Sequence, residues 1–270
     1  MSDGDDIQGT AHAMADAARG AVLPFFRAAT LVAEDKGDKI ADGGFDPVTE
    51  ADRAAEKAMR AVLAERRPDD SVIGEEFEKH SGSSGLTWVL DPIDGTRGFV
   101  AGTPTWGVLI AASDADAVRF GMIDQPYIGE RFWGGFGQAR MTGPQGARDL
   151  KTRGEGPLSE AILCTTFPEV GSVVEGAAFR EVSKVCRLTR YGLDCYAYAL
   201  LAAGHIDLVI EAGLSNYDIQ APIGVIEAAG GIVTDWQGRP ALQGGRVIAA
   251  AGRVQHAAAL EILGRVIAEG

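Results

Sequence analysis

Two early segments carry apolar residues at helical spacing. Residues 10–28 are rich in Ala and predict a helix that bends at Pro24. Further on, Thr49 followed by Asp52 forms a capping box, and apolar residues then recur every three or four positions. This second pattern predicts a helix over residues 50–67.

The middle of the chain carries short apolar runs separated by Gly and Pro, as in buried strands. The runs at 71–75 and 87–91 each end in a carboxylate. Three more, over 105–112, 117–124 and 130–136, have the spacing of an antiparallel meander.

Strand and helix patterns alternate in the second half of the chain, which favours a layered α/β sandwich. Because a domain typically has about 150 residues, a chain of 270 accommodates two lobes, which we place at 1–153 and 154–270. The second lobe is expected to hold strands over 161–166, 186–190, 206–211, 231–235 and 246–251, and helices over 172–184, 194–204, 218–229 and 254–268.

Charge and composition narrow the classes of partner. With 25 Lys and Arg against 38 Asp and Glu, the formal net charge of −13 disfavours nucleic acids and anionic membranes. The first residues lack the features of a signal peptide, and no apolar run approaches the ~18 residues that cross a bilayer. Three cysteines without CxxC spacing indicate reduced thiols, and so a cytoplasmic protein.

The most informative string is Asp91-Pro92-Ile93-Asp94-Gly95-Thr96, which follows a predicted buried strand. If a helix starts here, Gly95 and Thr96 present free backbone N–H groups that favour a phosphate. The two carboxylates would repel that phosphate unless divalent cations lay between them, and oxygen ligands favour Mg²⁺ or Mn²⁺ over zinc.

An isolated D-x-x-D-G string is more often a surface turn than a metal site. The other acidic segments of the chain therefore decide between these two interpretations. Gly74-Glu75-Glu76 ends the preceding predicted strand, and Asn216-Tyr217-Asp218 precedes a helix rich in Gly and Ala. Acids at the ends of three segments can form a metal cluster at one edge of a sheet. The sequence therefore favours a metal-dependent phosphate site.

Together with Glu227-Ala228-Ala229-Gly230-Gly231, these strings resemble the inositol monophosphatase family, and the resemblance extends from Asp46 to Gly231. It implies a layered αβαβα fold, like that of fructose-1,6-bisphosphatase, and a Mg²⁺-dependent phosphatase that acts on a small phosphorylated metabolite. It also implies a homodimer.

The resemblance assigns metal ligands by position. Glu75 and Asp91, with the carbonyl of Ile93, would hold a first Mg²⁺, and Asp91, Asp94 and Asp218 a second. A third, weaker Mg²⁺ would sit on Glu75 largely through water, so that two to three ions bind, and Mn²⁺ is a candidate substitute.

The same resemblance assigns the reacting groups. Thr96 would hydrogen-bond the attacking water, Asp46 would polarise Thr96 or a metal-bound water, and Glu75 would take part through its metal. The amides of Gly95 and Thr96 would hold phosphate oxygens. Lys36 and Lys39, in a polar stretch over 34–44 that predicts a loop or hairpin, either close over the phosphate or are solvated.

Within the family, four strings look most like the histidinol-phosphate phosphatases. One departure is Gly98, where those enzymes often carry Ser or Asn; another is Tyr217, which replaces the Trp of the inositol enzymes and weakens inositol phosphate as the substrate. The strings are Pro47–Ala54, Asp94–Phe99, Ile123–Pro126 and Asp194–Asp207.

Three side chains are candidates for the substrate's alcohol part. Glu211 matches the family's acidic contact; Asp194 either contacts a cationic group or caps the following helix; Arg97 either contacts substrate or pairs with a neighbouring acid. Because acids suit a cationic amino alcohol, L-histidinol phosphate is the expected substrate. Inositol 1-phosphate, fructose bisphosphate and a phosphoadenosine nucleotide are the alternatives.

Two other hypotheses are weaker. A haloacid-dehalogenase type of phosphatase needs a nucleophilic D-x-D string, and Asp114-Ala115-Asp116 has the surroundings of a solvated turn instead. A non-catalytic binding or regulatory protein would be expected to have an incomplete acidic set, whereas every expected carboxylate is present here.

Overall fold

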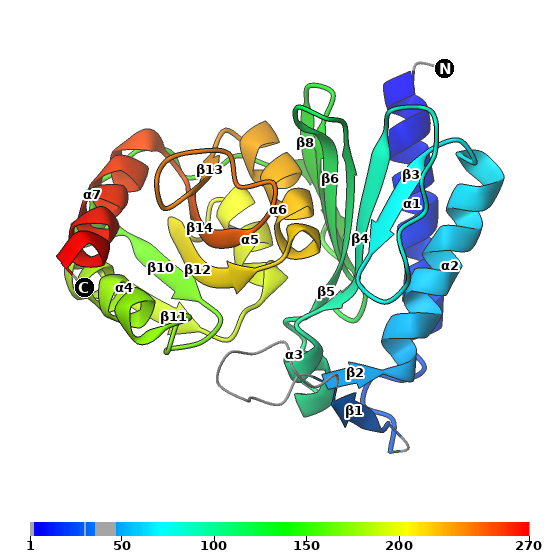
Figure 1. Cartoon of the computed structure of the whole chain (residues 1–270), viewed down its shortest axis with the longest axis horizontal. Coiled ribbons are helices and arrows are strands. Elements are labelled where there is room, and N and C mark those ends of the chain that lie inside the picture. The colour runs from blue at the N-terminus through cyan, green and yellow to red at the C-terminus, as the bar shows by residue number, and fades with distance from the viewer. Residues whose placement is uncertain (1–2, 30, 36–46, 270) are drawn as a thin grey trace.

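The computed structural model describes residues 3–29, 31–35 and 47–269, and its elements stack in five layers (Figure 1). Helices α1 (Asp3–Val22) and α2 (Glu50–Arg66) cover one face of a seven-stranded sheet. Helices α5 (Cys195–Ala202) and α6 (Asn216–Ala228) lie between this sheet and a five-stranded one. Helices α4 (Val173–Val185) and α7 (Arg253–Glu269) cover the outer face. The layered αβαβα fold is therefore confirmed.

The larger sheet follows chain order from β3 to β9, with β3 parallel to β4 and every later pair antiparallel. The predicted meander is confirmed, but the hairpin of β8 and β9 was not predicted. Most of its residues are exposed, so no apolar alternation marks it. The strands are β3 (Ser71–Gly74), β4 (Thr87–Asp94), β5 (Gly107–Ser113), β6 (Val118–Gln125), β7 (Glu130–Gly135), β8 (Gln138–Gly143) and β9 (Gly146–Asp149).

The smaller sheet has the order β11-β10-β12-β14-β13. Its side chains alternate: Val247 and Ala249 face α5 and α6, whereas Ile248 and Ala250 face α4 and α7. Its strands are β10 (Ile162–Thr165), β11 (Leu188–Tyr191), β12 (Leu208–Leu214), β13 (Ile232–Asp235) and β14 (Gly245–Ala250); the remaining elements are β1 (Ala33–Asp35), β2 (Pro47–Thr49), α3 (Thr96–Ala101) and a 3-10 turn over Leu158–Glu160.

The first helix differs from its prediction over 10–28. It begins at Asp3 and ends at Val22. Three acidic residues in its first turn stabilise this start, because negative charge interacts favourably with the positive end of the helix dipole. Pro24 lacks an N–H and disfavours the helical conformation of the residue before it, so the helix stops rather than bends. By contrast, α2 matches its prediction, and its capping box is present: the N–H of Thr49 donates to Asp52 Oδ2 at 2.8 Å.

Several expectations concern the chain between the first two helices. β1 and β2 pair antiparallel. Residues 36–46 between them, which include Lys36, Lys39 and Asp46, lie outside the described residues.

Across the described part of the chain, no helix is both long and apolar enough to span a membrane. The three cysteines are free thiols.

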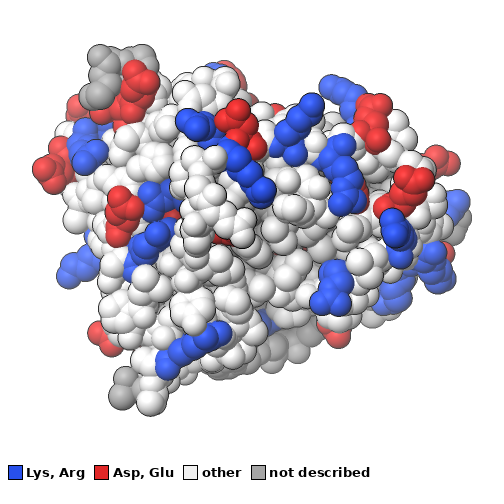
Figure 2. Space-filling model, turned by 180° about the vertical axis from the view of Figure 1, so that it is seen from behind, with Lys and Arg blue, Asp and Glu red and all other residues white. Residues whose placement is uncertain are grey.

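The rear face of the molecule carries charges of both signs (Figure 2). Lys and Arg side chains lie beside Asp and Glu along much of its rim, and a broad band without charged side chains crosses its centre. Over the described residues of this face, positive and negative side chains are therefore interspersed rather than gathered into one field of a single sign.

Candidate active site

An acidic cluster lies where the end of β4 meets the start of α6. Oxygen atoms of Asp91, Asp94 and Asp218 all lie within 4.8 Å of one another. Asp91 is 2% exposed, and Asp218 also accepts a hydrogen bond from the Ser215 N–H at 2.6 Å, which fixes it in the first turn of α6. Segments 124 positions apart in sequence thus supply one site.

A bulge in β4 explains why its two acids converge. Asp91 pairs with Leu109 of β5, but Asp94 pairs with Gly107, so β4 has one residue more than its partner over this stretch. Residues three apart in a regular strand point to opposite faces, and the extra residue turns both carboxylates to the same side. Asp91 Oδ1 also accepts from the Ile93 N–H at 3.0 Å, which stabilises the bulge.

The cluster is suited to a hard cation. Burial raises the pKa of Asp91 well above its ordinary value, and the charges of Glu75, Asp94 and Asp218 raise it further. Burial likewise raises the pKa of Asp94, helped by Asp194 and Asp218. Several buried carboxyls at such spacing repel one another when ionised, and Mg²⁺, which binds oxygen ligands at about 2.1 Å, removes that repulsion. The donor set therefore fits the metal.

Glu75 lies near Asp91, and the backbone that follows it is held by a residue that the sequence analysis missed. It follows β3, and behind it the buried Glu56 of α2 accepts from the Glu76 N–H and from Arg60, each at 2.7 Å. Gly74 leaves room for this side chain, since a Cβ there would lie 1.9 Å from Glu56 Oε1. An acid among the buried positions of α2 was the signal that could have found it.

The second half of the chain reaches the cluster through the backbone of α5. The Cys195 N–H donates to Asp94 Oδ2 at 2.6 Å. Asp194 precedes α5, but its side chain makes no capping hydrogen bond, so of its two predicted roles the helix cap is wrong. Thr105 Oγ1 donates to its carboxylate at 3.4 Å instead. Burial raises the pKa of Asp194 to about 6, while Thr105 and Arg97 lower it.

Glu211 is a buried carboxyl in β12, held by two threonines that the sequence analysis did not single out. Its oxygens accept from Thr165 Oγ1 at 3.1 Å, from the Thr166 N–H at 2.6 Å and from Thr166 Oγ1 at 2.9 Å. Burial nevertheless raises the pKa of Glu211 to about 7. Three fixed donors give this carboxyl one orientation.

Glu211→Gln is expected to stabilise the protein more at pH 8 than at pH 5. The pKa of Glu211 is about 7 when folded and about 4.5 when unfolded, so its contribution to stability is fully present below pH 4.5 and is lost as the pH rises through 7. Gln has no such loss. Urea unfolding at both pH values checks this, with the exposed Glu261→Gln as control; an equal difference between variant and wild type at both pH values would contradict it.

Arg97 packs its guanidinium over the Phe167 ring, 4.8 Å from the ring centre. Its charge also lowers the pKa of Asp194. It therefore lies between an aromatic side chain and an acid, an arrangement that is compatible with either role predicted for it.

Gly95 and Thr96 begin α3 as expected. Gly95 has φ of 83°, a left-handed conformation that favours glycine, and the next residue starts the helix. Thr96 Oγ1 donates to the Ile93 carbonyl at 3.0 Å, so its oxygen keeps its lone pairs for a second partner.

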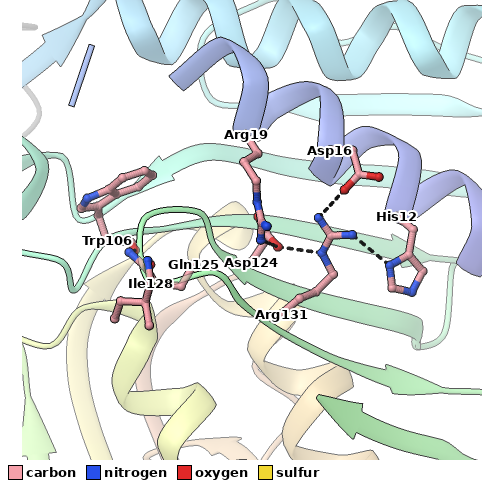
Figure 3. A network of polar contacts seen from close by, with 8 residues as sticks. All are labelled: His12, Asp16, Arg19, Trp106, Asp124, Gln125, Ile128 and Arg131. Atoms are coloured by element: carbon pink, nitrogen blue, oxygen red, sulfur yellow. Dashed lines mark hydrogen bonds and ion pairs between the residues drawn. The ribbon is translucent and has the colours of Figure 1, made fainter. Parts of the chain in front are cut away.

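A buried ion network lies beside this region (Figure 3). Asp124 of β6 is fully buried and accepts from Arg131 at 2.6 Å and from Arg19 of α1 at 2.8 Å. The neighbouring Gln125 donates to the Trp106 carbonyl at 3.0 Å. The Ile123–Pro126 string thus ties α1 to the sheet and fixes the start of β5, against which Asp94 pairs.

Comparison with known proteins agrees with this geometry. The chain matches the model of the inositol monophosphatase family over residues 3–268. A histidinol-phosphatase of Streptomyces coelicolor is 35% identical over 261 residues, which are 93% of this chain and 94% of that protein. A chloroplastic bifunctional phosphatase of Arabidopsis thaliana is 40% identical over 237 residues, which are 87% of this chain but 66% of that protein, just under two thirds of its length.

A solved structure of an inositol monophosphatase from Zymomonas mobilis has a TM-score of 0.84 at 39% identity and covers 98% of this chain and 99% of that one. The family is Mg²⁺-dependent, and the cluster of Asp91, Asp94 and Asp218 is consistent with its metal site. The chain therefore belongs to the inositol monophosphatase family and is a metal-dependent phosphomonoesterase.

Proposed function

We propose that the protein is a Mg²⁺-dependent histidinol-phosphatase, which converts L-histidinol phosphate to L-histidinol in histidine biosynthesis. The observation that carries this proposal is a pair of acids beside the cluster: the half-buried Asp194 acts electrostatically on Asp94, and the buried Glu211 lies within electrostatic range of Asp194. Acids in this position favour a substrate whose alcohol part carries a positive charge.

Metal binding would use the acidic cluster. Glu75, Asp91 and the Ile93 carbonyl would hold one ion, and Asp91, Asp94 and Asp218 another. A bound Mg²⁺ lowers the pKa of water, clamps the phosphate and stabilises the departing oxygen.

The protein's own groups orient the reactants. Because Thr96 Oγ1 already donates to the Ile93 carbonyl, it can accept a hydrogen bond from the attacking water and so fix that water's orientation. The amides of Gly95 and Thr96 would hold phosphate oxygens at the start of α3. Asp46 would polarise Thr96 or the water, and it lies outside the described residues.

Glu211 would receive the cationic group of the substrate. Thr166 donates twice to Oε1 and Thr165 once to Oε2, so one lone pair of Oε2 remains for an ammonium group, which would favour the ionised form of Glu211. Arg97, stacked on Phe167, would lie beside Asp194 at this end of the site.

Phosphate release from a panel of monoesters tests the proposal. The metal-stripped protein is assayed with L-histidinol phosphate, inositol 1-phosphate, fructose 1,6-bisphosphate and a phosphoadenosine nucleotide, with and without Mg²⁺. We expect Mg²⁺ to be required and kcat/KM to be about 10-fold or more higher for L-histidinol phosphate, the difference that one added charge contact of about 1.4 kcal/mol supplies.

Other outcomes of the panel would be equally informative. A preference for inositol 1-phosphate would replace the proposed substrate and keep the metal chemistry. Activity indifferent to Mg²⁺ would contradict the mechanism itself. An inositol-phosphate phosphatase is the alternative because the similar Zymomonas mobilis protein is an inositol monophosphatase.

Two further expectations stay predictions. The resemblance implies a homodimer, which sedimentation would test. The free thiols suit a reducing compartment such as the cytoplasm.

A further inference from the structure

We propose that Asp194 is a positioning residue, whose left-handed backbone aims the Cys195 N–H at Asp94 and so sets the geometry of the metal site. The inference rests on the proposed role of Asp94 as a metal ligand. It gives Asp194 a task that is distinct from contacting substrate or capping α5.

The backbone of Asp194 is unusual for its residue type. Its φ is 47° and its ψ is −141°, a region that strongly favours glycine. A residue with a Cβ stays in such a conformation only where its surroundings hold it. Asp194 directly precedes the amide that donates to Asp94, so its ψ sets the direction of that N–H.

The side chain of Asp194 is held by α3 and the segment that follows it. Its carboxylate accepts from Thr105 Oγ1. It also packs where two glycines lack side chains: a Cβ on Gly95 would lie 2.7 Å from Asp194 Cγ, and one on Gly98 would lie 3.3 Å from Asp194 Oδ2. Gly98, the departure from the histidinol enzymes noted above, thus makes room for this carboxylate.

The contact joins the two lobes at a proposed metal ligand. Asp94 ends β4 of the large sheet, and Cys195 begins a helix 101 positions later. A hydrogen bond to a ligand's oxygen orients that ligand, and losing such a contact typically weakens metal binding 10–100-fold. If the turn at Asp194 relaxed, the amide would leave Asp94 and the carboxylate would be free to rotate.

Three substitutions distinguish the effect of the Asp194 backbone conformation from the effect of its charge. Asp194→Ala, Asp194→Gly and Asp194→Asn all remove the negative charge. Only Ala both lacks a side chain to reach Thr105 and disfavours positive φ; Gly adopts this conformation freely, and Asn tolerates it and keeps a polar group. We therefore expect the Ala variant to differ from the other two.

The first readout is Mn²⁺ binding to each folded variant without substrate, followed by electron paramagnetic resonance. We expect Asp194→Ala to bind Mn²⁺ about 10-fold more weakly than Asp194→Gly, with Asn close to Gly. Thr105→Val, which removes the donor and leaves Asp194 in place, should shift the affinity in the same direction as Ala. Its inclusion keeps the test decisive if the Ala variant fails to fold.

The second readout is hydrogen exchange of the Cys195 amide in the absence of metal, which should speed up in Asp194→Ala and not in Asp194→Gly. Equal Mn²⁺ affinity and equal exchange in the three variants, with a raised KM in all of them, would overturn the inference and make Asp194 a substrate contact. If the wild type bound no Mn²⁺, the proposed metal site would fail, while the exchange comparison would still decide whether Asp194 holds the turn.

Discussion

Asp94→Asn is expected to lower kcat/KM about 100-fold or more at saturating Mg²⁺ while leaving the fold intact. Removing a group that only orients a metal ligand costs 10–100-fold, so removing the charge of a direct ligand should reach at least the upper end. Asn has nearly the same volume, and its Oδ1 can still accept from the Cys195 N–H. Phosphate-release kinetics over a range of Mg²⁺ concentrations measure the loss.

The fold of this variant should be no less stable than that of the wild type without metal. Burial and the charges of Asp194 and Asp218 raise the pKa of Asp94, which shows that its ionised form is disfavoured there. Thermal unfolding in a chelator should therefore give an equal or higher Tm for the variant. Near-normal turnover at saturating Mg²⁺ would instead remove Asp94 from the ligand set.

Asp114→Asn is the matched control, because Asp114 is the nucleophile that a haloacid-dehalogenase mechanism would need. Its carboxylate accepts from the N–H groups of Asp116 and Ala117 in the β5–β6 turn, at 3.0 Å, and pairs with Arg119 at the start of β6. These contacts are those of a turn residue. We expect activity within about twofold of wild type; a large loss would favour the covalent mechanism.

Local signals predicted much of the fold. The capping box of Thr49 and Asp52 placed the start of α2, and the alternating pattern of the second half gave a layered sandwich with each strand near its observed place. The β8–β9 hairpin could not be found in this way, because exposed strands are held by ladder hydrogen bonds that leave no apolar period in the sequence.

In the site as well, features with a local sequence signal could be predicted and features that depend on distant contacts could not. Strand-end acids were visible in the sequence, and the structure brings Asp91, Asp94 and Asp218 together. The bulge that turns two of them to one side, and the amide of Cys195 that holds Asp94, depend on contacts between distant segments. Local sequence patterns do not indicate contacts between distant segments, so the bulge and the Cys195 hydrogen bond could be identified only from the structure.

Gly224→Ala in α6 is expected to destabilise the protein by about 1–3 kcal/mol, as overpacking of a core does. In an exposed helix the same change stabilises by up to about 1 kcal/mol. Here a Cβ would lie 2.6 Å from the Gly121 N and 2.8 Å from its Cα, both backbone atoms of β6 that cannot move aside. Because α6 carries Asp218, its displacement should also weaken metal binding.

Gly264→Ala in α7 is the control, and it is expected to stabilise the protein rather than destabilise it. Within the described structure, a Cβ at this position meets no atom within 4 Å beyond its own helix and chain neighbours, so the variant should gain up to about 1 kcal/mol from helix propensity alone. Urea unfolding of both variants, with the Mg²⁺ dependence of activity measured beside it, separates the two effects. If Gly224→Ala were as stable as Gly264→Ala, the close contact of α6 with β6 would not be what fixes Asp218 against the sheet. If it were destabilised with unchanged Mg²⁺ dependence, the contact would serve the fold without setting the metal site.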